Sequence, residues 1–366
     1  MFVHLKELKA QVLITPEPLL KTNAIAHVSL SNPIVSQSPK KGKLTMTCHN
    51  CQNEAKKHGF DRKGNRRYRC ETCSKTFIEP QDKPLENMYL PIETAALIIA
   101  LLVEGNSLRS TERLTGVNIN TIMKLLVVAG EKCERFLENR IKSVPVKDVE
   151  CDELWCFVEM KEKTKKKQIW DFDSRADQIG DAYTFVGFER NTKLVLAWHL
   201  GRRTFDDTWK FTKKLAEATA DQNFQVTTDG FASYRDTIVH ELGHKQIDFA
   251  QLIKVYAAPQ DDSHRYSPPV VVDIISNVIH GNPDPKRICT SIVERQNLTI
   301  RMQMRRFTRL TNAFSKKWEN LKAALGLFFA FYNFCRPHSS INKQTPAMAS
   351  GLTDHVWSIS ELLKVA

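Results

Sequence analysis

The sequence predicts a mixed α/β core preceded by two small modules, one rich in cysteine and one helical. Three observations lead to this division of the 366-residue chain. Two Cys-x2-Cys pairs stand within residues 45–80, an apolar helical pattern fills much of 90–135, and β-prone runs alternate with helical ones across 151–350. We expect a linker at 136–150 and a short C-terminal tail at 351–366.

Two further stretches are expected to lie outside the packed modules. Residues 1–44 mix apolar residues and prolines without a motif that can be placed, which is typical of a flexible extension. The run Pro80-Gln81-Asp82-Lys83-Pro84 is polar and rich in proline, so we predict a linker between the cysteine-rich and helical modules.

The cysteine-rich module carries two closely spaced pairs of thiols. Thiolates are soft ligands that suit Zn²⁺, and each tight Cys-x2-Cys loop places two sulfurs on one ion. The spacing therefore predicts a structural zinc ribbon. Its ligands would be Cys48, Cys51, Cys70 and Cys73.

The segment between the cysteine pairs is strongly basic, with Arg66 and Arg67 beside Tyr68. Basic density of this kind favours contact with phosphates. Tyr68 and Phe77 are available as a small core. A zinc-stapled folding unit or a protein-contact surface is the alternative.

The helical module has the layout of a helix-turn-helix. Its helices are expected at 92–103, 107–114 and 120–128, with a turn at 116–118. Asn120, Thr121 and Lys124 would then lie near the start of the recognition helix, where side chains reach DNA bases or backbone. A plain three-helix packing module is the alternative.

The order of elements after residue 150 matches an RNase H-like core. Strands are expected around Asp152, at 182–190, at 194–200 and before Asp229, with helices at 204–220 and 234–242. Asn191-Thr192-Lys193 is a hairpin signal, which makes the first three strands antiparallel.

Three carboxylates stand in settings that suit a metal site. Asp152 is placed where a strand begins, Asp229 closes a strand before Gly230, and Glu294 starts a helix that Ser291 is expected to cap. Carboxylates are the hard ligands that Mg²⁺ or Mn²⁺ needs, and phosphoryl transfer on nucleic acids commonly uses two such ions. Accidental triplets among the 41 acidic residues are the alternative.

Other acidic and basic segments receive different roles. Glu153 is not assigned to the metals, because neighbouring residues of a strand point to opposite faces. Asp206 and Asp207 are predicted to cap the following helix. The lysine-rich residues 161–167 are expected to form a basic loop, and 257–289 an inserted loop that makes Glu294 harder to place.

Several segments resemble those of DDE insertion-sequence transposases, in particular the IS-one-like family. They are Cys151-Asp152-Glu153-Leu154-Trp155, Thr228-Asp229-Gly230-Phe231-Ala232-Ser233-Tyr234, Val293-Glu294-Arg295-Gln296-Asn297 and Tyr332-Asn333-Phe334-Cys335-Arg336-Pro337-His338-Ser339-Ser340. The resemblance spans roughly residues 45–350 and includes the zinc ribbon ahead of the helical module. It implies Asp152, Asp229 and Glu294 as metal-binding catalytic residues, transposon ends as the double-stranded DNA substrate, and transposition as the outcome.

The helix that contains Glu294 is predicted to have a packing stripe and a basic stripe. The packing stripe comprises Val293, Ile300, Met304 and Phe307. Glu294, Arg301 and Arg305 form the neighbouring stripe, and Arg295 follows the glutamate directly. Arginines there could hold DNA phosphates in bidentate fashion; a solvated basic face is the alternative.

The composition agrees with a DNA enzyme. Fifty-three Lys and Arg against 41 Asp and Glu give a net charge of +12 and a pI of about 9.2, and a basic surface strengthens association with polyanions. Four of the nine cysteines have metal spacing and the rest are scattered, which indicates a reducing compartment. No glycine-rich phosphate loop is present, so no nucleotide cofactor is expected.

The sequence also bears on location. The apolar stretch Leu325 to Phe331 is far shorter than the ~20 residues that a membrane-spanning helix needs, and no signal peptide is evident. We expect a soluble, cytoplasmic, nucleoid-associated protein.

Three functions compete on this sequence. A transposase would bind the ends of an insertion sequence, cut and join DNA with Mg²⁺, and act as a homo-oligomer that pairs two ends. A zinc-ribbon and helix-turn-helix regulator would bind DNA with an inactive nuclease-like domain. A nuclease would share the transposase site but cut without joining.

Overall fold

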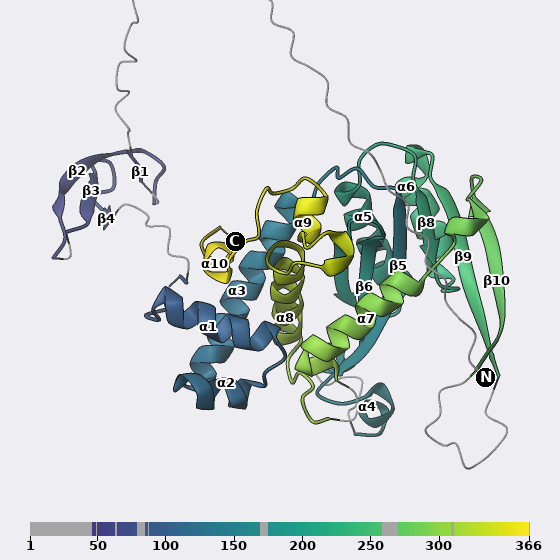
Figure 1. Cartoon of the computed structure of the whole chain (residues 1–366). Coiled ribbons are helices and arrows are strands. Elements are labelled where there is room, and N and C mark those ends of the chain that lie inside the picture. Colours follow the sequence, from purple (N-terminus) through teal and green to yellow (C-terminus); the bar gives the residue numbers. More distant parts are fainter. Residues whose placement is uncertain are drawn as a thin grey trace, which may run out of the picture. The chain divides into compact units, whose positions relative to one another are not determined.

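The computed structural model describes residues 46–48, 50–62, 64–78, 85, 86, 88–168, 175–257, 270–308 and 311–365. The described residues form two compact units, one within residues 1–80 and the other within residues 81–366 (Figure 1). The extension predicted at 1–44 and the linker predicted at Pro80 to Pro84 lie outside the described residues.

The first unit is a four-stranded antiparallel sheet in the order β1-β2-β3-β4. Its strands are β1 (Met46–Thr47), β2 (Glu54–Phe60), β3 (Arg66–Cys70) and β4 (Thr76–Ile78). Tyr68 is buried and stacks on Phe77, with ring centroids 6.0 Å apart. The small aromatic core predicted for this module is therefore confirmed.

The second unit is built on a six-stranded mixed sheet (Figure 1). In spatial order its strands are β10 (Val270–His280), β9 (Asp248–Ala257), β8 (Gln225–Thr228), β5 (Asp148–Val158), β6 (Gly180–Glu189) and β7 (Val195–Gly201). β5, β6 and β7 are antiparallel neighbours, whereas β8 runs parallel to both β5 and β9. This arrangement confirms the mixed α/β class and the predicted antiparallel start.

Helices cover both faces of this sheet. The three that border the carboxylates are α5 (Phe205–Ala218), α6 (Ser233–Leu242) and α7 (Ser291–Gln303). Phe185 of β6 stacks on Phe211 of α5, with ring centroids 5.7 Å apart. Asp152 points to the other face of the pleat, where Asn297 of α7 hydrogen-bonds to it. Helices α5 and α7 therefore lie on opposite faces.

A second group of helices packs beside the sheet within the same unit (Figure 1). It contains α1 (Ile92–Val103), α2 (Leu108–Thr115), α3 (Ile119–Arg140) and α8 (Trp318–Ala330). Ser107 caps α2 by accepting a 3.1 Å hydrogen bond from the Ser110 amide, and Gly116 ends it in the left-handed region. The three helices predicted between 92 and 128 are therefore present.

Helix α3 continues past its predicted end at residue 128 and past the predicted domain boundary at 135. Apolar residues down to Leu137 stay buried, and α3 packs along α8. The segment 136–150, expected as a linker, comprises the end of α3, a short connection and the start of β5. The helical module and the sheet consequently share one core.

The remaining short elements close the second unit. They are α4 (Glu162–Gln168), α9 (Pro346–Ala349), α10 (Ile359–Val365), 3-10 turns at Ala176–Gln178, Gly243–Lys245, Pro285–Arg287, Arg305–Phe307 and Ser339–Ile341, and a π-helical turn at Phe331–Cys335. The predicted tail at 351–366 contains α10, whose Leu362 and Leu363 are buried. None of the described helices is both long and apolar enough to cross a membrane.

Two predicted loops were wrong. The segment 257–289 contains β10 in its described part, an 11-residue β-branched strand paired with β9 at the edge of the sheet. The prolines that flank this strand suggested a loop, but the apolar run between them has β propensity. The lysine-rich segment 161–167 lies largely in helix α4, where lysine is a favourable residue.

The predicted helix caps also need correction. Thr204, not Asp206 or Asp207, caps α5 by accepting a hydrogen bond from the Asp207 amide. Ser291 is the first helical residue of α7, and Thr290 occupies the cap position. Each helix begins one or two residues away from the expected start, so a neighbouring polar residue takes the cap position.

The α3–α8 contact gives a stability prediction. A Cβ built on Gly130 of α3 would lie 2.1 Å from the carbonyl oxygen of Ala323 in α8. We expect Gly130→Ala to lower the free energy of unfolding by about 1–3 kcal/mol, because the two helices must separate. Urea unfolding measures this. Gly243→Ala, whose Cβ would find its nearest neighbour at 3.8 Å, is the control, and an equal loss in both variants would contradict the close helix contact.

Candidate active site

Asp152 and Asp229 meet because β8 runs parallel to the first four residues of β5 and ends beside Cys151. Cys151 pairs with Thr228, the last residue of β8. Asp152 follows Cys151 within β5, and Asp229 follows Thr228 after the end of β8. The two side chains therefore lie next to one another at the carboxyl end of β8. Asp152 therefore lies within strand β5, not at its beginning as predicted, while Asp229 follows its strand as expected.

Glu153 joins this pair, which corrects its exclusion. Asp152, Glu153 and Asp229 each present a carboxylate oxygen, and these oxygens lie within 4.8 Å of one another. Neighbouring strand residues do point to opposite faces. β8 stops at Thr228, however, so Asp229 stands beside the uncovered edge of β5, and side chains from both faces of β5 can reach it.

Glu294 lies in the first turn of α7, on the Asp152 side of the sheet. Its charge acts on both Asp152 and Asp229. One of its oxygens accepts hydrogen bonds from Thr290 Oγ1, at 2.7 Å, and from Lys254 of β9. The structure thus brings the third predicted carboxylate to the same region, but with its charge directed to a lysine.

Two contacts fix α7 against β5. Glu150 is buried, and its Oε2 accepts the backbone amides of Ile292 at 3.0 Å and Val293 at 2.8 Å. A carboxylate at a helix N-terminus satisfies unpaired amides and complements the helix dipole. Asn297 Nδ2 donates to Asp152 Oδ2 at 2.7 Å. These bonds determine where Glu294 is held.

Arg203 bridges the carboxylates from the face that α5 covers. Its Nε lies 3.1 Å from Glu153 Oε2, and its Nη2 lies 3.5 Å from Asp229 Oδ2. The guanidinium also sits over the ring of Phe231, 4.3 Å from its centroid. Asp207 accepts the amide of Arg202 at 2.7 Å and so orders the segment that carries Arg203.

Burial and repulsion disfavour the ionised forms of these carboxyl groups. Burial and then the charge of Asp229 raise the pKa of Asp152 to about 7. The same two causes raise the pKa of Glu153 to about 8. Burial also raises the pKa of Asp229. A divalent cation among these oxygens would remove the repulsion, since opposite charge favours the ionised form.

The donor set fits Mg²⁺ or Mn²⁺. These ions take oxygen ligands and keep several waters, so a few carboxylates are sufficient. Glu153 Oε1 is buried, and the only side chain that hydrogen-bonds to Glu153 on this side, among the described residues, is that of Tyr234, whose bond favours the ionised form. Arg203 and Lys254 supply positive charge to the cluster through their ion pairs. The cluster therefore offers closely spaced oxygen ligands whose negative charge a cation would offset.

The four cysteines predicted to bind zinc form a second metal-ligating group. Their sulfur atoms lie within 4.8 Å of one another, with Cys48 Sγ 3.5 Å from Cys73 Sγ and Cys51 Sγ 3.4 Å from Cys70 Sγ. Hydrogen bonds from backbone amides, that of Cys73 first, lower the pKa of Cys70 to about 6. The hydrogen bond with Cys70 raises the pKa of Cys51 to about 11 despite a backbone hydrogen bond from Asn53, so the two thiols share a proton without a metal. Thiolates are the form that binds zinc. This group could therefore hold a structural zinc ion.

The side chains predicted to contact DNA differ in how far they are exposed to solvent. On α7, Arg295 is exposed and Arg301 half-buried, and Arg305 is exposed in the 3-10 turn that follows. Because α7 ends at Gln303, the predicted basic stripe does not continue as one helix face. Val293, Ile300, Met304 and Phe307 are buried as predicted, but only Val293 and Ile300 lie on α7, so the packing stripe also does not continue as one helix face.

The other candidates lie on α3 and in the first unit. Asn120 and Lys124 are exposed at the start of α3, and Thr121 is half-buried. Arg66 sits over Phe60, 4.0 Å from the ring centroid. Arg67 donates to Thr76 Oγ1 at 3.3 Å.

The sequence reasoning missed several residues that shape the site. Glu150 stands two residues before Asp152, which places both on one face of a strand, and Asn297 follows Glu294 by three residues, which places both on one face of a helix. These spacings were available signals. Arg203 and Lys254 carried no signal, since only the folded sheet brings them to the carboxylates.

Comparisons with known proteins add little. No family model matches this sequence, and no curated protein matches it. Among solved structures, the crystal structure of endonuclease V from Streptomyces avermitilis is similar at 10% identity, over 49% of this chain and 87% of that chain, with a TM-score of 0.16. A likeness at that score carries no argument about fold or activity.

The raised carboxyl pKa values predict how metal-free stability depends on pH. Unfolded Asp and Glu titrate near ~3.9 and ~4.3, below the folded values of about 7 for Asp152 and about 8 for Glu153. Their protonation therefore contributes stability that is complete below about pH 4 and is lost as pH rises through about 7 to 8.

We expect Mg²⁺ to raise the melting temperature more at pH 9 than at pH 6, because the ion replaces the protons that stabilise the cluster at lower pH. Thermal unfolding in EDTA and in Mg²⁺ at both pH values measures the difference. Asp152→Asn with Glu153→Gln should remove it. An equal Mg²⁺ effect at the two pH values would contradict the assigned cluster.

The cysteine group predicts one bound zinc ion per chain. Cys70→Ser should release the ion and unfold the first unit, because the small aromatic core is not enough to hold its short strands together. Elemental analysis after dialysis and circular dichroism report both effects. Cys133→Ser, at a buried thiol of α3, should leave zinc content unchanged. Zinc retained by Cys70→Ser would remove that ligand from the site.

Proposed function

We propose that this protein is a DNA-cutting and DNA-joining enzyme that uses divalent metal ions, a DDE transposase similar to the IS-one-like family. The observation that carries the proposal is the meeting of Asp152 and Asp229 at neighbouring parallel strands, with Glu294 on a helix clamped to the same strand. Three antiparallel strands continued by two parallel ones also support an RNase H-like core.

The site's residues divide the work between holding cations and binding phosphate. Asp152 and Asp229 would hold Mg²⁺ or Mn²⁺, and Glu294 and Glu153 are the further oxygen donors. When bound, two such ions would increase the reactivity of the attacking oxygen and stabilise the leaving oxygen. Arg203, no longer needed to balance Glu153 and Asp229, would then be available to hold a phosphate oxygen.

The two other modules supply DNA recognition in this proposal. The cysteine-rich sheet with Arg66 and Arg67 would act as a zinc ribbon on the DNA backbone. Helices α2 and α3, joined by a three-residue turn at 116–118, would act as a helix-turn-helix. Asn120 and Lys124, exposed at the start of α3, support base or backbone contacts there.

Joining two DNA ends requires two active sites, so we infer a working form with at least two copies. The edge strand β10 supports protein contact, because Val272, Ile274 and Val278 are each more than half exposed along it. Apolar edge strands of this kind pair readily with another chain.

Strand cleavage and joining test the proposal. The substrate is a labelled fragment that carries the DNA flanking the coding sequence. With Mg²⁺ we expect cleaved and joined products, and Asp152→Asn or Asp229→Asn should lower both on the order of 10³-fold or more while DNA binding remains, because each removes a metal ligand. Asp206→Asn, at an exposed residue paired with Lys210, is the matched control and should keep full activity.

The products distinguish the three candidate functions. Mg²⁺-dependent joining that the aspartate variants lack supports the transposase. Cleavage without joining would instead make the protein a nuclease. Tight DNA binding with neither product would make it a regulator.

A further inference from the structure

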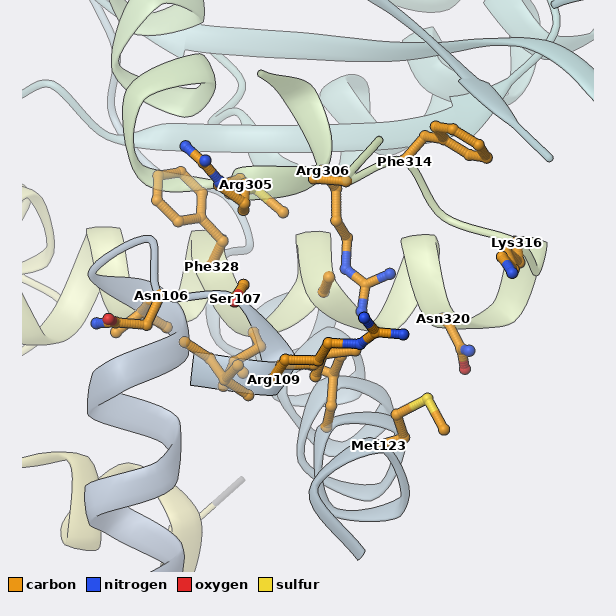
Figure 2. A pocket seen from close by; sticks show the side chains of 18 of the residues that line it. Asn106, Ser107, Arg109, Met123, Arg305, Arg306, Phe314, Lys316, Asn320 and Phe328 are labelled. Carbon is orange, nitrogen blue, oxygen red and sulfur yellow. The ribbon is translucent and has the colours of Figure 1, made fainter. Parts of the chain in front are cut away.

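The second unit contains a cavity of about 630 Å³ away from the carboxylates. Its walls come from the α1–α2 corner, the start of α3, the segment after α7 and the face of α8 (Figure 2). No acidic residue of the described chain lines the cavity, so we assign the cavity no role in metal binding. A volume of this size falls within the ~300–1,000 Å³ range of small-ligand sites.

The charged groups of the cavity all have one sign. Arg109, Arg305, Arg306 and Lys316 line it, and none of the four forms an ion pair with an acidic residue in the described ranges. In Figure 2 the side chains of Arg109, from α2, and Arg306, from the turn after α7, extend toward the same part of the cavity. Convergent unpaired cations favour an anionic ligand.

Arg306 is the most constrained of these cations. Burial lowers its pKa to about 10, and its Nη1 donates to Ser315 Oγ at 2.7 Å. Arg306 is half-buried, and taking a cation partly out of water is costly unless a charge partner is present. An anion in the cavity would supply that partner.

The rest of the lining combines polar and apolar side chains. The polar ones are Asn106, Ser107, Thr311, Asn312 and Asn320. Leu102, Leu126, Leu327 and Phe328 lie among the cavity residues, so a ligand that fits must carry a hydrophobic or aromatic part as well as negative charge. A nucleotide has both, in its base and its phosphate. Bases bind proteins by stacking and apolar contact while arginines hold the phosphates.

Two features connect the cavity to the proposed DNA path. Met304 of the cavity lies ten residues after Glu294 along α7 and its C-terminal end, which corresponds to ~15 Å at 1.5 Å per residue. Met123 lines the cavity from α3, beside the exposed Lys124. The α1–α2 corner also packs closely against the end of α7, because a Cβ on Gly105 would lie 3.1 Å from the Gln303 carbonyl oxygen.

We propose that this cavity holds one unstacked nucleotide of the DNA strand, with its base on the apolar floor and its phosphate at Arg109, Arg306 and Lys316. The inference rests on the proposed function as a DNA enzyme. Removing a base from the stack costs free energy, least where the base is already unpaired.

The test compares the binding of two duplexes by the full chain in EDTA, measured by fluorescence anisotropy. One duplex is fully paired and the other carries a single unpaired 2-aminopurine. The wild-type protein should bind the bulged duplex about 10-fold more tightly, which corresponds to about 1.4 kcal/mol, because the unpaired base of that duplex is already partly unstacked before binding. The 2-aminopurine emission should also change on binding.

Two kinds of variant locate the effect. Arg109→Gln with Lys316→Gln removes exposed cavity cations, and Asn320→Trp fills the cavity from α8. Both should lower the preference for the bulge to about 2-fold or less. Arg113→Gln with Lys317→Gln removes the same charge from exposed residues outside the cavity and should keep the preference. Circular dichroism confirms that each variant folds.

Each other outcome contradicts a specific statement. Equal binding of the two duplexes by wild type, or a preference that survives in both cavity variants, would overturn the nucleotide site and leave the proposed function intact. Failure to bind either duplex would overturn the proposed function itself. Tight binding of palmitate that neither duplex displaces would assign the cavity to a lipid instead.

Discussion

The site depends on one constraint: carboxylates of like charge must be held close together in a half-buried place. Asp152, Glu153 and Asp229 do not gather by mutual attraction, since each raises the energy of the others in the ionised form. The backbone pairing between β5 and β8 holds them, and that pairing is set by strand register and by the apolar core beneath it. A cation bound there would reverse the repulsion, so the sheet and the metal would stabilise one another.

Helix α7 extends this constraint across the second unit. Glu150 holds its N-terminus to β5, and the buried residues Val293 and Ile300 pack its length onto the core. At its other end, Gln303 meets the α1–α2 corner at Gly105. One helix thus links the carboxylates, the cavity of positive residues and the helices proposed to bind DNA. A shift of α7 would therefore move residues at the carboxylates, at the cavity and at the helices proposed to bind DNA, because closely packed interiors transmit displacements.

Features that depend on local chemistry could be predicted from the sequence. The cap at Ser107, the left-handed end at Gly116 and the thiol group of the first unit each follow from a few neighbouring residues. Features that depend on contacts between segments far apart in the sequence could not be predicted. The part played by Glu153 depends on where β8 stops, and the extent of α3 depends on α8, some 200 residues later in the chain. The cavity likewise combines segments that are distant in sequence, so no local pattern marks it.

Diffraction from crystals soaked in Mn²⁺, with the anomalous signal of the metal recorded, tests the central claim most directly. We expect anomalous peaks bonded to the carboxylate oxygens of Asp152 and Asp229, about 2.0–2.2 Å away, with Glu294 or Glu153 as a further ligand. Arg203 and Lys254 should move off their carboxylates. An absence of peaks at these aspartates in fully soaked crystals, with both ion pairs kept, would contradict a metal-dependent active site.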